Sequence, residues 1–171
     1  MLDYLDREGL AENTIVIYTS DQGFFLGEHG WYDKRFMYEE SLRMPFIIRY
    51  PKEVAAGTVC REMTTNVDMA PTLLDYVGVA VPEYMQGHSF RAVLRGETPP
   101  DWPTSIYYRY WMHLAHHYVY AHYGVRTRGH KLIYYYAKAL GATGAIDDSK
   151  PPEWELFDLE HDPLEMRSVY D

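Results

Sequence analysis

An apolar, β-branched run at residues 15–19 leads directly into a polar loop with several glycines at residues 20–34. The run shows no alternation of polar and apolar side chains, which predicts a strand covered on both faces in a parallel sheet. The loop then follows the carboxyl end of that strand, where open α/β sheets usually carry their ligands. A second run of the same kind follows Pro45, at residues 46–50. These features indicate an α/β sheet with a functional loop at one edge.

The pattern of residues along the chain changes near residue 100. Before that point, Asp68 as an N-cap, Pro71 in the first turn and Gly78 as a stop predict a helix. After it, short aromatic runs separated by polar turns predict a small antiparallel sheet and then a short terminal helix. The predicted strands are residues 105–111, 117–120, 123–127, 131–136 and 154–159. The predicted fold class is therefore α/β, with a mixed α/β sheet domain in residues 1–100 and a small antiparallel subdomain in residues 101–171.

The composition excludes several classes of partner. The net charge of -9 argues against nucleic acid or an anionic membrane surface, because neither would be attracted to it. No apolar run reaches the roughly 18 residues that a membrane-spanning helix needs. The single cysteine, Cys60, excludes an internal disulfide. The 17 tyrosines, most of them between Tyr107 and Tyr136, are expected to pack on the sheet, and a sugar-stacking platform is the alternative.

Asp21 and Gln22 place two oxygen donors where the predicted strand gives way to the loop. Hard cations such as calcium take about 6–8 oxygen ligands, so these two residues are at most part of a shell. A turn aspartate is the competing interpretation. His29 and Lys34 follow in the same loop, and each taken singly is an ordinary polar or charged surface residue. Together the four residues would suit a hard cation and an anionic ester.

Several stretches of the chain, taken in order, resemble the sulfatase family of the alkaline phosphatase superfamily. They are Asn13-Thr-Ile-Val-Ile-Tyr-Thr-Ser-Asp-Gln-Gly, Gly27-Glu-His-Gly, Asp33-Lys-Arg-Phe-Met-Tyr-Glu-Glu-Ser-Leu-Arg-Met-Pro, Asn66-Val-Asp-Met-Ala-Pro-Thr-Leu-Leu-Asp, Gln86-Gly-His-Ser, Tyr123-Gly-Val-Arg-Thr-Arg-Gly-His-Lys-Leu-Ile and Trp154-Glu-Leu-Phe-Asp-Leu-Glu-His-Asp-Pro. The resemblance covers essentially the whole chain. It implies the C-terminal part of a sulfatase α/β domain followed by that family's small antiparallel subdomain.

The resemblance also implies roles for residues of the loop. Asp21 and Gln22 match the family pair that supplies two calcium ligands, so the expected cofactor is calcium. Lys34 matches the lysine that contacts the sulfate ester, where a fixed cation can stabilise developing negative charge. His29 and Arg35 lie in the same loop and are expected to line the substrate pocket. In the second subdomain, His122 and Arg126 flank a stretch that often approaches the substrate, and both are candidates for sugar or sulfate contacts.

The family's nucleophile has no counterpart in this sequence. It is a formylglycine made from the cysteine or serine of a Cys/Ser-x-Pro/Ala-x-Arg motif, and neither Cys60 nor Ser149 lies in such a motif. The formylglycine is therefore expected in an N-terminal part that is missing here, together with the remaining calcium ligands. The chain alone is expected to be inactive and to self-associate or to pair with that part.

The expected activity of the parent protein is hydrolysis of a sulfate monoester, either a sulfated carbohydrate or an aryl sulfate ester. A phosphoric ester hydrolase of the same superfamily is one alternative, and a non-catalytic glycan-binding module is another. The family resemblance suggests a periplasmic, secreted or lysosomal location for the full-length protein.

Overall fold

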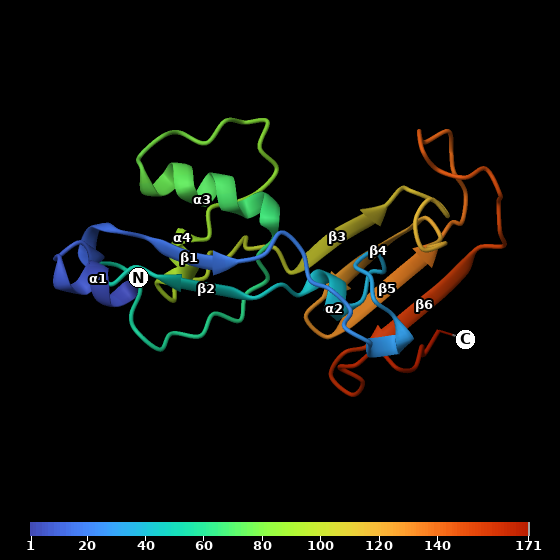
Figure 1. Ribbon diagram of the computed structural model, residues 1–171, viewed down its shortest axis with the longest axis horizontal. Helices are drawn as coiled ribbons and strands as arrows, with labels where there is room; N and C mark the ends of the chain where they lie inside the picture. The colour runs from blue at the N-terminus through green and yellow to red at the C-terminus, as the bar shows by residue number, and fades with distance from the viewer. Residues whose placement is uncertain (171) are drawn as a thin grey trace. The chain divides into compact units, whose positions relative to one another are not determined.

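The computed structural model describes residues 1–170, and its contacts divide the chain into two compact units (Figure 1). The first unit combines Met1–Thr19 with Pro45–Pro103, and the second combines Ser20–Met44 with Thr104–Asp171. The polar loop therefore belongs to the same unit as the C-terminal sheet. The domain assignment 1–100 and 101–171 stays a prediction.

The first unit contains a two-stranded sheet and several short helices. Its elements are α1 (Leu2–Arg7), the 3₁₀ helix η1 (Ala11–Asn13), β1 (Val16–Thr19), β2 (Phe46–Arg49), the 3₁₀ helix η3 (Asn66–Asp68), α3 (Met69–Tyr76) and α4 (Arg91–Leu94). Both predicted strands are present, but they pair antiparallel, with Val16 opposite Arg49. The expectation that both faces are buried is wrong for this pair, since the side chains of Tyr18 and Ile47 are 66% and 64% exposed. An apolar run indicates that a strand tends to be buried. It does not determine whether the strand pairs parallel or antiparallel, because that depends on the partner strand.

Helix α3 begins where the sequence predicted. Thr65 and Asp68 form a capping box at the start of η3, in which the backbone N–H of Thr65 donates to the Asp68 carboxylate at 2.7 Å. The helix continues through the buried Pro71 and is followed by Gly78 at φ +71°. Its Met69 packs on the core of the unit, which is formed by Phe90, Val93, Leu94 and Trp102.

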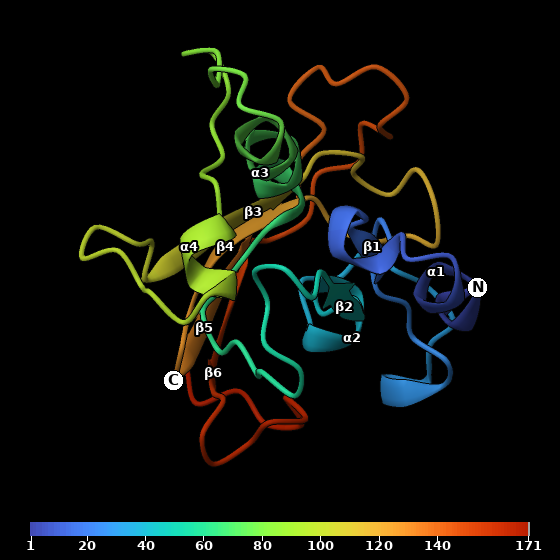
Figure 2. The ribbon, with the colours of Figure 1, turned by 90° about the vertical axis from the view of Figure 1, so that its left-hand side faces the viewer.

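The second unit is built on a four-stranded antiparallel sheet in the order β3-β4-β5-β6 (Figure 2). Its elements are the 3₁₀ helix η2 (Glu28–Gly30), α2 (Glu39–Leu42), β3 (Ser105–Tyr110), β4 (His122–Thr127), β5 (His130–Tyr135) and β6 (Glu153–Asp158). Four of the five predicted strands are confirmed. Residues 117 and 118 form a turn instead, and residues 119 and 120 are irregular. His117 and Tyr118 have positive φ angles that a strand does not allow. A short terminal helix was expected after the turn at residues 158–163, but residues 164–170 form a turn and irregular backbone instead.

One face of this sheet is covered by the segment of residues 20–44. Met37 inserts into a buried cluster with Ile133, Tyr135 and Phe157. Met37 can approach the sheet because β4 carries Gly124 at this point. A Cβ atom on Gly124 would lie 2.5 Å from the Met37 sulfur and 2.4 Å from the Leu132 carbonyl oxygen. The sequence therefore allows a close contact that any other residue at position 124 would block.

Replacing Gly124 with alanine should lower the free energy of unfolding by about 1–3 kcal/mol, because the added methyl group overpacks this contact. Urea denaturation followed by circular dichroism measures the change. Gly129→Ala is the matched control, since its Cβ would meet only the flexible end of the Glu160 side chain at 3.1 Å. Equal stability of the two variants would contradict the close approach at Gly124.

Candidate functional site

The polar loop lies against helix α2 because of Gly23. The Gly23 N–H donates a hydrogen bond to the carbonyl oxygen of Ser41 at 2.9 Å. A Cβ atom at position 23 would lie only 2.1 Å from the Glu40 carbonyl oxygen. The glycine is thus required for close approach of two backbone segments. This contact fixes the residues immediately before it, Asp21 and Gln22.

The structure brings Gln22 and Lys34 together. The Gln22 side-chain amide donates to the backbone carbonyl of Lys34, so its own amide oxygen is left as an acceptor. The backbone carbonyl of Gln22 accepts a hydrogen bond from the Ser20 hydroxyl at 2.7 Å, and the side chain of Asp21 is exposed to solvent. Two adjacent side-chain oxygens are therefore presented at the start of the loop, and the backbone of Lys34 is anchored beside them.

The side chain of Lys34 is half-buried and makes no ion pair with any residue in the described part of the chain. Its two neighbours are paired with each other, because the Arg35 guanidinium contacts the buried Asp33 carboxylate. The backbone carbonyl of Arg35 also accepts a hydrogen bond from the Tyr108 hydroxyl at 3.2 Å. The loop thus holds one cation without a counter-ion, while Arg35 is committed to an internal pair.

His29 lies on a turn of positive φ in η2. Its Nε2 atom is 3.7 Å from a Glu40 carboxylate oxygen, and its ring centroid is 4.9 Å from that of Tyr38. The side chain is mostly buried between these groups. The structure therefore places His29 in the loop's packing against Glu40 and Tyr38, and its predicted role as a substrate contact stays a prediction.

His122 is fully buried among aromatic rings. Its Nδ1 atom is 2.7 Å from the Tyr120 carbonyl oxygen, and its Nε2 atom has no hydrogen-bond partner among the described residues. The ring packs against Phe36, Tyr108 and Tyr135, with centroids 5.0–6.2 Å away. Burial lowers the pKa of His122 to about 4, so the imidazole is neutral at pH 7. Its predicted contact with a sugar or sulfate stays a prediction.

The depressed pKa of His122 predicts that stability falls in mild acid. The unfolded chain binds a proton below about pH 6.5 and the folded chain only below about pH 4, so the free energy of unfolding decreases as the pH falls between these values. Between pH 7 and pH 5 this one group should contribute a loss of about 2 kcal/mol. Urea unfolding at the two pH values should show that His122→Phe loses correspondingly less stability than the unchanged chain. An identical pH dependence in both proteins would contradict the assignment.

Arg126 is held by a group of charged residues that no local sequence pattern predicted as a whole. Its Nε and Nη2 atoms each donate to the Glu39 carboxylate at 3.2 Å. Lys131 Nζ lies 3.0 Å from a Glu39 oxygen and 2.6 Å from a Glu165 oxygen. We call Glu39, Arg126, Lys131 and Glu165 the buried ion cluster. Arg126 is thereby fixed as part of the fold, and its predicted role in substrate binding stays a prediction.

One feature of the sequence indicates the buried ion cluster, namely a lysine in an alternating pattern with apolar residues. Lys131, Ile133 and Tyr135 alternate along β5, so their side chains lie on the same face of the sheet. All three are buried, and the Lys131 side chain is completely so. A lysine on an inward-facing position of a strand requires acidic partners. The sequence does not reveal that these partners are Glu39 and Glu165.

The side chains of Asp21 and Gln22 have the right type of ligand atom for calcium, because both offer the oxygen donors that hard cations prefer. Within residues 1–170, no three His, Cys, Asp or Glu side chains gather closely enough to hold a metal ion. These two residues can therefore supply part of a calcium shell, and further oxygen ligands are needed to complete it.

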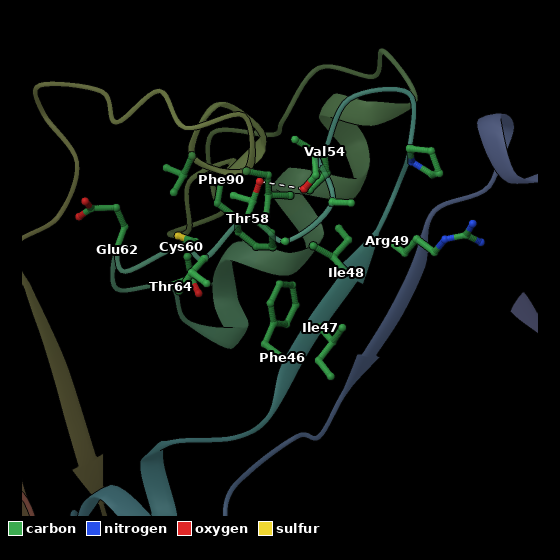
Figure 3. Close-up of a pocket in the computed structure, with 17 residues that line it drawn as sticks. Phe46, Ile47, Ile48, Arg49, Val54, Thr58, Cys60, Glu62, Thr64 and Phe90 are labelled. Carbon is green, nitrogen blue, oxygen red and sulfur yellow. Dashed lines mark hydrogen bonds between the residues drawn. The ribbon is translucent and has the colours of Figure 1, made fainter.

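The first unit holds a cavity of about 840 Å³ along β2 (Figure 3). Its walls are largely apolar and include Phe46, Ile48 and Phe90, together with the single cysteine, Cys60. Arg49 points away from the cavity and pairs with Asp6 at 2.5 Å. No histidine and no free basic side chain lines this cavity, which therefore lacks the chemistry present in the polar loop.

Comparison with known families identifies the chain. Residues 27–171 match the family described as N-sulphoglucosamine sulphohydrolase, C-terminal. The chain belongs to the sulfatase family. The described residues of this sulfatase chain contain no helix long and apolar enough to cross a membrane.

Relatives of the sulfatase chain agree with this assignment. An N-acetylglucosamine-6-O-sulfatase of Bacteroides thetaiotaomicron is 51% identical over 172 residues, which are 99% of this chain and 29% of the relative. A solved structure of a protein in complex with its substrate, D-glucosamine-2-N,6-O-disulfate, superposes with a TM-score of 0.85 at 50% identity and covers 98% of this chain and 32% of that one. A phosphonate monoester hydrolase from Silicibacter pomeroyi shares the fold at 24% identity and a TM-score of 0.73, over 93% of this chain and 31% of that one. The sulfatase chain thus spans about a third of these proteins.

Proposed function

We propose that this chain is the part of a sulfate monoester hydrolase that supplies calcium ligands and a cation for the sulfate group. The observation that carries the proposal is the half-buried Lys34 without a counter-ion, anchored through its backbone to the Gln22 side chain. A half-buried cation of this kind attracts an anionic ester, and its effect is largest where negative charge develops during reaction.

The residues of the loop have separate tasks in this proposal. Asp21 and Gln22 would hold calcium through their side-chain oxygens, and because the Gln22 amide nitrogen donates to the Lys34 carbonyl, its amide oxygen stays available as a ligand. Calcium, when bound, supplies a Lewis acid that polarises the sulfate oxygens. Lys34 donates to a sulfate oxygen or to the leaving oxygen. No residue of this chain is assigned as the nucleophile, and we propose that a formylglycine outside these residues has that role and that the chain alone does not turn over.

The substrate we propose is a 6-O-sulfated glucosamine derivative. The support comes from a relative that is 51% identical and is named as an N-acetylglucosamine-6-O-sulfatase. It also comes from a solved structure, at 50% identity, with D-glucosamine-2-N,6-O-disulfate as its substrate. The net charge of -9 requires that such an anion be bound by a local cation, and Lys34 provides one.

The test is to exchange the matching region of the Bacteroides relative for this chain and to measure released sulfate by ion chromatography. We expect the hybrid to hydrolyse 6-O-sulfated N-acetylglucosamine and to lose this activity when calcium is removed with a chelator. Asp21→Asn should raise the calcium concentration needed for half-maximal activity at least tenfold, because a charged oxygen ligand becomes neutral. Asp3→Asn, at an exposed position in the first unit, is the matched control.

The outcomes separate the proposal from its alternatives. Sulfate release that ignores both the chelator and Asp21→Asn would contradict the role of the loop in calcium binding. Release of phosphate from phosphate esters in preference to sulfate would favour a phosphoric ester hydrolase. Retention of glycans without release of either anion would favour a binding module.

A further inference from the structure

The second unit contains a cavity of about 520 Å³ on the face of its sheet that the segment of residues 20–44 covers. Six aromatic residues line it: Trp31, Phe36, Tyr38, Tyr118, Tyr120 and Tyr135. Its charged lining residues are Asp148, Lys150, Glu153 and Glu155. We call this cavity the aromatic–acidic cleft. It is large enough for a sugar ring and carries flat apolar faces, on which the CH groups of a sugar can stack.

The orientation of Glu155 is fixed by two tyrosines. The Tyr38 hydroxyl donates to the two oxygens of this carboxylate at 3.0 and 2.9 Å, and the Tyr135 hydroxyl donates to one of them at 2.9 Å. Burial, together with the nearby charge of Glu155, raises the pKa of both tyrosines, so both hydroxyls remain protonated donors. The Glu155 carboxylate is therefore fixed in the wall of the cleft, and no cation pairs with it in the described chain.

Glu153 adds a second carboxylate beside the first. It lies two residues before Glu155 on β6, so both side chains lie on the same face of the sheet. It makes no ion pair within residues 1–170. The only positive group in the lining, Lys150, pairs with Asp148 at 2.7 Å. The cleft thus holds two carboxylates that make no ion pair within the described residues, next to aromatic rings.

This combination of aromatic rings and carboxylates favours a positively charged ligand over a negatively charged one. Aromatic faces and carboxylates both attract cations, since the ring face carries partial negative charge. A sulfated or phosphorylated group would meet the two free carboxylates and be repelled. A protonated amine would be attracted by both kinds of group.

We infer that the aromatic–acidic cleft binds an amino sugar with an unmodified, protonated amine, through Glu153, Glu155 and the surrounding rings. The sugar ring stacks on the aromatic side chains while the ammonium group faces the carboxylates. This inference rests on the cleft alone and does not depend on the sulfate chemistry proposed for Asp21, Gln22 and Lys34.

The probe is glucosamine, compared with N-acetylglucosamine, which has the same ring but no charge. Dissociation constants for the 171-residue chain are measured by ligand-observed NMR at pH 6.5, where the amine is protonated. We expect glucosamine to bind about tenfold more tightly than N-acetylglucosamine. Equal affinity for the two sugars, or binding of neither, would overturn the inference.

Two variants place the binding in the cleft. Glu153→Gln should weaken glucosamine binding about tenfold and leave N-acetylglucosamine unchanged, because only the charge is removed. Tyr118→Ala, at a side chain that is 78% exposed, should weaken both sugars by removing a stacking surface without disturbing the core. The matched controls are Glu83→Gln and Tyr84→Ala in the first unit, where Tyr84 is 81% exposed. An effect of the controls as large as that of the cleft variants would overturn the assignment to this cleft.

Discussion

Replacing Lys131 with methionine should destabilise the chain by about 3–5 kcal/mol, which is a large fraction of the stability of a typical domain. Lys131 is completely buried and lies 3.0 Å from Glu39 and 2.6 Å from Glu165. Methionine keeps most of the volume of the side chain and removes its charge. The two carboxylates would then remain in the interior with only Arg126 to compensate them, and burying an unpaired charge is costly.

The measurement is urea denaturation of the variant and of Lys138→Met, which removes a lysine from an exposed position in the same unit. The control should change the free energy of unfolding by less than about 0.5 kcal/mol. Adding Glu165→Gln to Lys131→Met should recover part of the loss, because one of the stranded charges is removed as well. If Lys131→Met and Lys138→Met were equally stable, the buried ion cluster would contribute nothing to the fold.

Replacing Lys34 with alanine should lower the turnover of the sulfate-releasing hybrid by about 100- to 1,000-fold. This is the usual loss when a single group that stabilises transition-state charge is removed. The expected effect is on kcat more than on KM, because the cation interacts more strongly with the developing charge than with the bound ester. Lys34 has no counter-ion in the described chain, so nothing within that part competes for its charge.

Steady-state kinetics of sulfate release decides this prediction. Lys34→Arg keeps the charge and should retain part of the turnover, although its planar group cannot reproduce the position of the ammonium. Lys52→Ala, at an exposed lysine of the first unit, is the control and should behave as the unchanged hybrid. Turnover within twofold of the parent in Lys34→Ala would remove Lys34 from the proposed site.

Local patterns in the sequence predicted much of the fold and the family. Aromatic and β-branched runs predicted four strands of the C-terminal sheet, and the residues Asp68, Pro71 and Gly78 predicted α3. The stretches around Asp21 and Lys34 indicated the sulfatase family, which the comparison confirms. These features could be predicted because they depend on backbone preferences and on residue order within a few neighbouring positions.

The tertiary structure alone decided which side chains meet. The backbone N–H of Glu39 donates to the Glu165 carboxylate across 126 positions of sequence, and Tyr38 meets Glu155 across 117. The antiparallel pairing of β1 with β2 and the burial of His122 likewise depend on distant segments. The same distant contacts created the buried ion cluster and the aromatic–acidic cleft. A residue's charge state and accessibility depend on all the groups around it, and a sequence pattern reports only those that are near in the chain.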